Sequence, residues 1–176
     1  KGNIILEKCK TWRKLDLMSL AGEVMNEFTN TPPEDQCQEL LIDAIGIGAG
    51  LCDRINEIGI IPTRGVNVSE SSALTNECGN LRAELWYKAR EFFEKKTCQI
   101  PDDHELIREL STPRYKFDSR GRYLIESKDE MRRRGERSPD LADAFCLTFA
   151  SNPAILSGGE RISWSSPLKR DIQGIE

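Results

Sequence analysis

The sequence feature that most constrains the fold is the segment Glu39–Arg54, ELLIDAIGIGAGLCDR. The apolar residues 40–42 predict a short strand buried on both faces, and Asp43 follows it directly. The three glycines within Gly46–Gly50 predict a turn, and the apolar spacing from Leu51 onward predicts a helix. This order places an acid at the carboxyl end of a buried strand, where α/β folds place functional groups.

An ionised carboxylate at Asp43 is costly unless a positive charge meets it, and a metal ion is the obvious compensating charge. The glycine turn Gly46–Gly50 has two other interpretations, an ordinary tight turn and the phosphate loop of a dinucleotide-binding domain. The match to that loop is imperfect, because its third glycine would fall at Leu51. A metal-binding role for Asp43 therefore needs support from elsewhere in the chain.

The length and composition are those of one globular domain. The chain has 176 residues, of which 38% are hydrophobic, and can bury one sizeable core. No apolar run reaches membrane-spanning length, and the first residues lack the apolar region of a signal peptide, so we expect a cytoplasmic protein. Residues 1–150 are expected to form the domain, and the residues 151–176, rich in Pro, Gly and Ser, a loosely attached tail.

Cysteine and histidine usage restricts the kind of metal site. The six cysteines are widely spaced without a CxxC pair, which argues against a zinc site and against a disulfide scaffold. The single histidine, His104, lies at a predicted helix start and is expected to be solvated. A metal bound here must therefore use oxygen ligands, which favour Mg or Mn.

The formal net charge of −4 is unevenly distributed. The segment from Thr112 to Arg137 holds nine Lys or Arg and five Asp or Glu, which makes it +4 and leaves −8 for the rest of the chain. Local basic stripes bind phosphate backbones even on acidic proteins. A solvated arginine-rich face has the same pattern, so the charge alone leaves both interpretations open.

The last apolar helix carries two further candidate acids. Ser138 is predicted to cap the segment SPDLADAFCLTFA, with Pro139 at its first helical position and the helix nearly buried all round. Asp140 and Asp143 share one face of its first turn. The helix dipole favours acids at this position, but two carboxylates on an otherwise buried helix are more than capping requires.

Periodicity and turn residues predict the remaining elements. The order strand, helix, strand from residue 40 to residue 68 predicts a parallel crossover unit. The other predicted elements are a strand within residues 2–11, a helix over 17–30 capped by Asp16, a long helix capped by Asn80, a short helix from Pro101, a hairpin formed by 114–118 and 122–127, and a short helix or ordered loop over 128–134.

Four segments, in this order, resemble the nuclease domain of the large terminase subunit of tailed bacteriophages: IDAIGIGAGLCDRI, NLRAELW, IESKDEMRRRG and SPDLADAFCLTFA. The resemblance covers about residues 2–150 and implies an RNase H-like α/β fold, a mixed sheet flanked by helices. It implies that Asp43, Asp140 and Asp143 are catalytic acids that hold one or two Mg or Mn ions. Lys128 matches the lysine beside that site, where it would contact the substrate phosphate or orient a carboxylate.

The resemblance also implies a metal-dependent endonuclease that cuts double-stranded DNA, largely without sequence specificity, to start and end viral genome packaging. Its implied partners are DNA, the small terminase subunit, the portal and an ATPase motor domain ahead of the nuclease, and its implied location is the host cytoplasm. The family's first strand, with its essential aspartate, would precede Lys1, so we expect a domain that lacks this strand. The residues expected to bind the DNA backbone are Arg120, Arg122, Lys128, Arg132, Arg133, Arg134 and Arg137.

Three other functions remain open on the sequence alone. The same acids suit a Holliday-junction resolvase-like nuclease, which a preference for branched DNA would favour. A dinucleotide-binding domain would use the turn Gly46–Gly50, and stabilisation by NAD but not by Mn would support it. Without its first strand, the domain would serve only as a docking module of the packaging machine.

Overall fold

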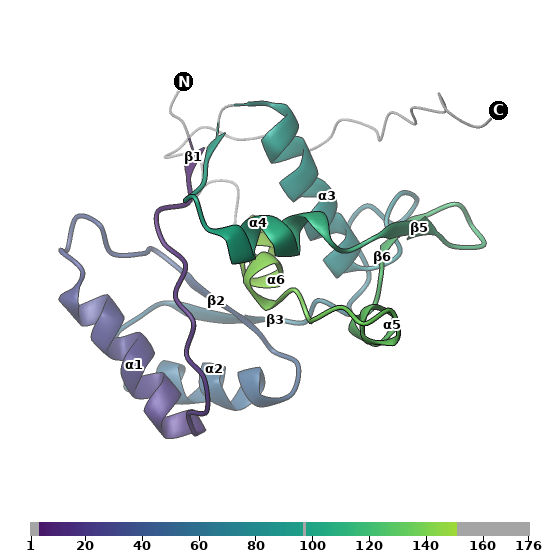
Figure 1. The fold of residues 1–176 in the computed structure, drawn as a ribbon. Coiled ribbons are helices and arrows are strands. Elements are labelled where there is room, and N and C mark those ends of the chain that lie inside the picture. The colour runs from purple at the N-terminus through teal and green to yellow at the C-terminus, as the bar shows by residue number, and fades with distance from the viewer. Residues whose placement is uncertain (1–3, 97, 151–176) are drawn as a thin grey trace.

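The computed structural model of the chain describes residues 4–96 and 98–150, which form helices packed around short strands (Figure 1). The predicted tail at residues 151–176 lies outside the described residues. The elements in chain order are β1 (Ile4–Ile5), α1 (Leu17–Asn30), β2 (Leu40–Asp43), α2 (Ile47–Ile58), β3 (Thr63–Val66), α3 (Leu81–Glu94), β4 (Cys98–Gln99), α4 (His104–Ser111), β5 (Tyr115–Phe117), β6 (Tyr123–Ile125), α5 (Lys128–Arg133), α6 (Asp140–Leu147) and the 3-10 helix η1 (Thr148–Ala150).

The central unit is the predicted crossover. β2 and β3 are parallel, with Leu40 aligned to Thr63 and Asp43 aligned to Val66, and α2 connects them. Within the described residues the strands form three pairs, because β1 is parallel to β4 and β5 is antiparallel to β6. The hairpin prediction is thus confirmed.

The alternating side chains of β2 enter two different cores. Leu41 packs against the core formed by α3 and α6, which includes Leu85, Trp86 and Phe145. Leu40 and Ile42 pack against the core formed by α1 and α2. Helices therefore cover both faces of β2, as its apolar run predicted.

The prediction that β2 is fully buried is nevertheless wrong, because Leu40, Leu41 and Ile42 are only partly buried. Among the described residues β2 pairs with β3 alone, so its other edge stays open. The amino-terminal strand is also shorter than predicted. Among the described residues it covers Ile4–Ile5, which pair with Cys98–Gln99, and the charged residues Glu7 and Lys8 that follow are exposed.

The glycine turn is shorter than predicted. α2 begins at Ile47, so Gly48 and Gly50 belong to the helix, while Gly46 has a left-handed backbone with φ of 66°. A Cβ atom on Gly48 would lie 1.8 Å from the carbonyl oxygen of Asp43, so only glycine lets α2 approach the end of β2 this closely. Gly48 therefore lets the helix lie against Asp43, while a Cβ atom on Gly50 would instead meet Leu17 of α1.

The helices α1 and α3 start as predicted, but α4 and α6 do not. Asp16 and Asn80 cap α1 and α3, whereas the helix predicted from Pro101 begins only at His104, with Asp103 as its N-cap. The start of α6 was predicted wrongly. This helix begins at Asp140 after Pro139, which offers no side-chain cap, and Ser138 is not the N-cap.

The exposure of α6 also differs from the prediction, since Ala144 and Thr148 are exposed. The helix is therefore buried on one side only. None of the helices in the described part of the chain is both long and apolar enough to cross a bilayer. All six cysteines are free, as their spacing predicted.

Candidate active site

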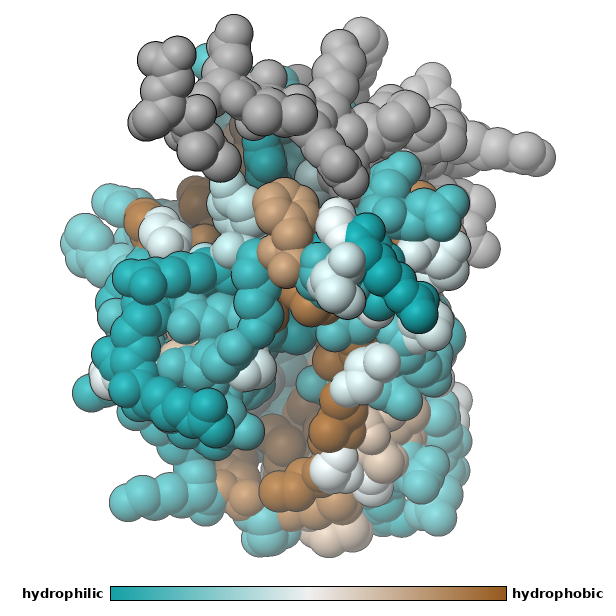
Figure 2. Space-filling view, turned by 90° about the vertical axis from the view of Figure 1, so that its right-hand side faces the viewer, coloured by the Kyte–Doolittle hydropathy of each residue, from teal (hydrophilic) through white to brown (hydrophobic). Residues whose placement is uncertain are grey.

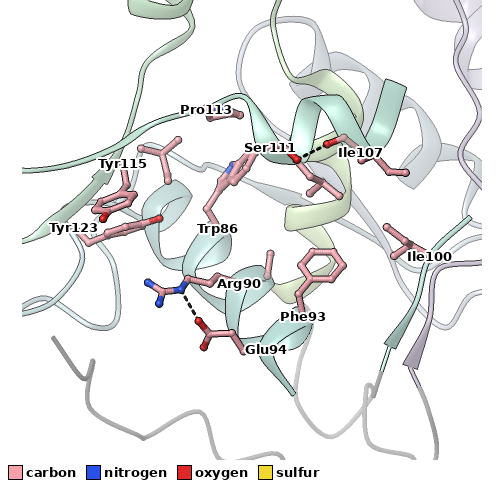
Figure 3. Close-up of a pocket in the computed structure, with 13 residues that line it drawn as sticks. Trp86, Arg90, Phe93, Glu94, Ile100, Ile107, Ser111, Pro113, Tyr115 and Tyr123 are labelled. Carbon is pink, nitrogen blue, oxygen red and sulfur yellow. Dashed lines mark hydrogen bonds and ion pairs between the residues drawn. The ribbon is translucent and has the colours of Figure 1, made fainter. Parts of the chain in front are cut away.

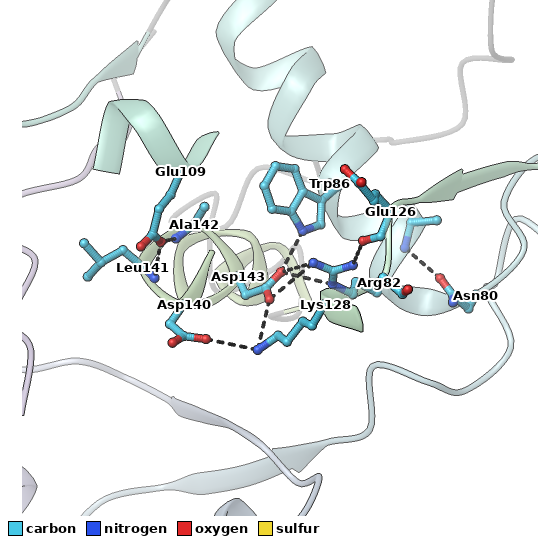
Figure 4. Close-up of polar contacts among 12 residues, drawn as sticks. Asn80, Arg82, Trp86, Glu109, Glu126, Lys128, Asp140, Leu141, Ala142 and Asp143 are labelled. Carbon is cyan, nitrogen blue, oxygen red and sulfur yellow. Dashed lines mark hydrogen bonds and ion pairs between the residues drawn. The ribbon is translucent and has the colours of Figure 1, made fainter. Parts of the chain in front are cut away.

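Three of the four predicted catalytic residues meet where α5 and α6 begin. Asp140 and Lys128 are the first residues of α6 and α5, and Asp143 lies one turn further along α6. The Lys128 Nζ atom lies 3.1 Å from Asp140 Oδ1 and 3.4 Å from Asp143 Oδ2 (Figure 4). The lysine therefore bridges two carboxylates that share one helix face.

Asp143 is held by residues of α3. Its carboxylate accepts hydrogen bonds from Arg82 Nε at 3.1 Å and Arg82 Nη2 at 3.0 Å, and from Trp86 Nε1 at 2.9 Å. Arg82 Nη1 also donates to the backbone carbonyl of Glu126 at 2.8 Å, just before α5. Asp143 and Arg82 are only 20% and 16% exposed, so this network anchors α6 to α3 and leaves the oxygens of Asp143 largely occupied.

Asp140 is the accessible acid of the pair. Its side chain is 75% exposed and contacts Lys128, and it lies at the positive end of the helix dipole. Desolvation by neighbouring groups acts to raise the pKa of Asp140, but the hydrogen bonds from Lys128 and Ser138 outweigh it and lower the pKa. The carboxylate is therefore ionised at neutral pH.

Lys128 responds to the same pair of acids. Partial burial acts to lower the pKa of Lys128, but the hydrogen bond with Asp140 and the charge of Asp143 outweigh it and raise the pKa. The ammonium group is therefore charged at neutral pH. It lies between the carboxyl groups of Asp140 and Asp143.

Asp43 lies at the carboxyl end of β2 and is exposed. Side chains alternate along a strand, so Asp43 belongs to the same face as Leu41, which is the face covered by α3 and α6. α6 contacts β2, and the carboxyl ends of β2 and β3 lie on the side of the molecule where α5 lies (Figure 1). Asp43 Oδ1 accepts a hydrogen bond from the Ile45 amide at 3.1 Å.

The described residues contain no group of three or more Asp, Glu, His or Cys side chains placed to hold a metal ion. The predicted set of three carboxylates is thus not assembled, because Asp143 is turned toward Arg82 and Trp86. The accessible acids are Asp43 and Asp140.

Apart from Lys128, which contacts Asp140 and Asp143, the predicted backbone-binding residues fall into two groups. Arg122, Arg132 and Arg134 form ion pairs with Asp118 at 2.7 Å, Asp129 at 2.9 Å and Glu126 at 2.7 Å, respectively. Arg134 also donates to the Thr112 carbonyl at 3.1 Å and is only 25% exposed, so it stabilises the base of the hairpin. This differs from its predicted role as a freely accessible phosphate ligand.

The exposed group consists of Arg120, Arg133 and Arg137, whose side chains make no ion pair with any residue of the described ranges. Arg120 lies in the turn of the hairpin, Arg133 at the end of α5, and Arg137 in the connection to α6. Figure 2 shows the side of the molecule that carries the hairpin and α5, where strongly hydrophilic side chains gather beside a hollow with a partly hydrophobic floor. This side can face an extended anionic partner.

A second hollow lies between α3, α4 and the hairpin. It is a groove of about 460 Å³ with a mainly apolar lining that includes Trp86, Ile107, Tyr115 and Tyr123 (Figure 3). The Trp86 ring lines this groove, while its N–H group donates to Asp143. The groove lacks a cluster of acids and is thus distinct from the candidate active site.

Three residues that hold this site were not predicted. Arg82 and Trp86 occupy positions one turn apart on α3, a spacing that places both on one face and is compatible with a shared partner. Glu109 of α4 accepts hydrogen bonds from two backbone amides of α6. No sequence signal points to Glu109, because its partners lie more than thirty residues away.

The comparisons with known proteins identify the fold class. Neither a protein-family model nor a curated protein matches the chain. Solved structures do match, and they include nuclease domains of phage large terminase subunits. Their identity to this chain is low, so the likeness establishes the fold, and the predicted RNase H-like α/β class is confirmed. The single mixed sheet of that prediction is not seen, because the strands of the described residues form three two-stranded sheets.

Two of the similar structures come from bacterial virus Sf6. A mutant nuclease domain of its large terminase subunit, with manganese and beta-thujaplicinol, has a TM-score of 0.73 and 19% identity over 85% of this chain and 79% of that domain. The same domain without those additions has a TM-score of 0.60 and 22% identity over 76% and 69%. The large terminase nuclease from thermophilic phage G20c has a TM-score of 0.57 and 14% identity over 78% and 63%.

Proposed function

We propose that the chain is the nuclease domain of a viral DNA-packaging terminase and acts as a divalent-metal-dependent endonuclease on double-stranded DNA. One observation carries the proposal. In a fold shared with terminase nuclease domains, Lys128 contacts Asp140 and Asp143 at the start of α6, and α6 packs against β2, whose last residue is Asp43. Acids beside a lysine suit phosphoryl chemistry.

The accessible residues fit a hydrated hard cation. Mg usually keeps several waters and binds through one or two carboxylates together with substrate phosphates, so Asp43 and Asp140 form a sufficient donor set. When bound, one or two Mg or Mn ions supply the activated water and the Lewis acid for phosphodiester hydrolysis. The Sf6 nuclease domain with manganese supports this choice of metal.

The chain's own residues then bind and orient the substrate. Lys128, which remains charged at neutral pH, can donate to a phosphate oxygen when it leaves Asp140. Arg120, Arg133 and Arg137 offer exposed guanidinium groups to the backbone on either side. Contacts to phosphates rather than base edges make cleavage largely independent of sequence.

We expect the chain to convert supercoiled plasmid to relaxed and linear forms in the presence of Mn, and EDTA to stop the reaction. Asp140→Asn should abolish cleavage, because it removes the charge of an accessible ligand while keeping the size of the side chain. Asp129→Asn is the matched control, since Asp129 is equally exposed on α5 but pairs only with Arg132. Cleavage that persists in EDTA, or in Asp140→Asn, contradicts the proposal.

DNA binding should depend on the exposed arginines. Replacing Arg120, Arg133 and Arg137 by glutamine should weaken binding to a duplex and lower the slope of log K against log salt by about 0.9 for each phosphate that these residues neutralise. The matched control is Arg13→Gln, an exposed arginine outside this segment. Fluorescence anisotropy at several salt concentrations measures both quantities, and an unchanged slope would exclude these residues as ligands of the DNA backbone.

The packaging context extends the same proposal. A terminase nuclease works in the host cytoplasm with a small terminase subunit, a portal and an ATPase motor domain, and we propose these partners for this chain. The resolvase alternative predicts a preference for branched over linear DNA in the cleavage assay. The dinucleotide alternative has no support from the turn, because Gly48 serves the packing of α2 against Asp43.

A further inference from the structure

The amino end of α6 is capped by a side chain from another helix. Pro139 precedes the helix without a side-chain cap, and Glu109 Oε2 accepts hydrogen bonds from the amides of Leu141 at 2.7 Å and Ala142 at 3.1 Å (Figure 4). Glu109 is only 4% exposed. The first N–H groups of a helix have no partner within it, so Glu109 satisfies them from the protein interior.

The surroundings of Glu109 support this role. α4 packs against α6, and Leu110, the neighbour of Glu109, packs against the core that contains Ala142. Burial raises the pKa of the Glu109 carboxyl, while the two amide hydrogen bonds act against this rise. Arg108 Nη2 lies 3.7 Å from Glu109 Oε1, beyond hydrogen-bond distance, so the amides are the principal partners of Glu109.

This cap has a consequence for Asp140. A carboxylate at the start of a helix ordinarily accepts hydrogen bonds from free N–H groups of the first turn. Those of Leu141 and Ala142 are already occupied by Glu109, and the Asp140 carboxylate contacts Lys128 on the exposed side instead. The two acids at the start of α6 thus have different roles. Glu109 is buried and caps the helix, whereas Asp140 is exposed to solvent.

We propose that Glu109 is a positioning residue that keeps the carboxylate of Asp140 available to a metal ion. The metal in this inference rests on the proposed function, whereas the placement of Asp140 concerns the metal-free protein. Removing Glu109 leaves the amides of Leu141 and Ala142 without their acceptor, and Asp140 directly precedes them in α6. Asp140 then caps its own helix and is withdrawn from the cation.

Two substitutions test the inference. Glu109→Ala should reduce Mn affinity by about 10- to 100-fold, as the loss of an orienting partner typically does. Glu109→Gln keeps an acceptor oxygen and should restore most of that affinity. Asp16→Ala is the control for stability, because it removes the cap of the distant α1 and should leave Mn affinity unchanged.

A metal-free measurement separates this inference from the proposed function. In the absence of metal, the ¹⁵Nζ resonance of Lys128 should shift in Glu109→Ala, because this substitution breaks the contact between Lys128 and Asp140. The resonance should not shift in Glu109→Gln. An unchanged Lys128 resonance in Glu109→Ala overturns the positioning role, even where the wild-type chain binds no Mn and the nuclease proposal fails. Unchanged Mn affinity in Glu109→Ala overturns it as well.

Discussion

Replacing Asp43 by asparagine should lower the Mn affinity of the chain by more than about a hundredfold and abolish metal-dependent cleavage. This loss exceeds the one typical of a residue that only hydrogen-bonds to a metal ligand. Asparagine keeps the size of the side chain and an oxygen that can accept the Ile45 amide, so the strand end should stay intact. Only the negative charge is removed. With Asp143 tied to Arg82, Asp140 would then be the one accessible acid at this edge.

Isothermal titration with Mn measures the effect of Asp43→Asn on affinity, and plasmid cleavage measures its effect on activity. Asp53→Asn is the matched control, because Asp53 is an exposed acid on α2, the helix that follows the same turn. Circular dichroism confirms that both variants are folded. If Asp43→Asn binds Mn with wild-type affinity, Asp43 is not a metal ligand. The resemblance of its segment to the terminase nuclease then has no functional meaning.

Replacing Arg82 by methionine should destabilise the protein by about 3 kcal/mol or more, the cost of leaving one partner of a buried ion pair without its counter-charge. Asp143 would retain Trp86 and Lys128 as donors but would no longer have the two-pronged partner that neutralises it. Arg90→Met is the control, because the Arg90–Glu94 pair on the same helix is more than half exposed and should contribute about 0–1 kcal/mol.

Urea unfolding of the Arg82 and Arg90 variants gives both free energies. A double variant in which Asp143 is also made apolar should recover part of the stability, since the unpaired charge is then absent. A cost for Arg82→Met as small as that for Arg90→Met would show that Asp143 is better solvated than its 20% exposure suggests. Asp143 would then be available as a ligand rather than an anchor.

Local patterns predicted much of the fold. The crossover β2–α2–β3 was predictable because its apolar spacing and glycines lie within thirty residues, and the caps Asp16 and Asn80 act on their own helices. The end of the amino-terminal strand was not predictable, because its partner β4 lies more than ninety residues away. The start of α6 was missed for the same kind of reason, since Glu109 replaces the local cap.

The sequence singled out Asp140 and Asp143 but could not predict their different surroundings. Asp140 and Asp143 are equivalent in the sequence, both in the first turn of one helix. The fold distinguishes them, because Arg82 and Trp86 of α3 hold one and leave the other exposed. Likewise, the nine basic residues of the segment 112–137 look alike, yet Arg134 is occupied at the hairpin base and Arg133 is exposed.

The two-core arrangement around β2 determines where its terminal acid points. Leu40 and Ile42 enter one core and Leu41 the other, so the direction of the next side chain is set by parity alone. Inserting or deleting a single residue between Leu41 and Asp43 would reverse that direction and aim the carboxylate at α1 and α2. The packing of Leu40, Leu41 and Ile42 into two separate cores thus fixes the direction of the Asp43 side chain.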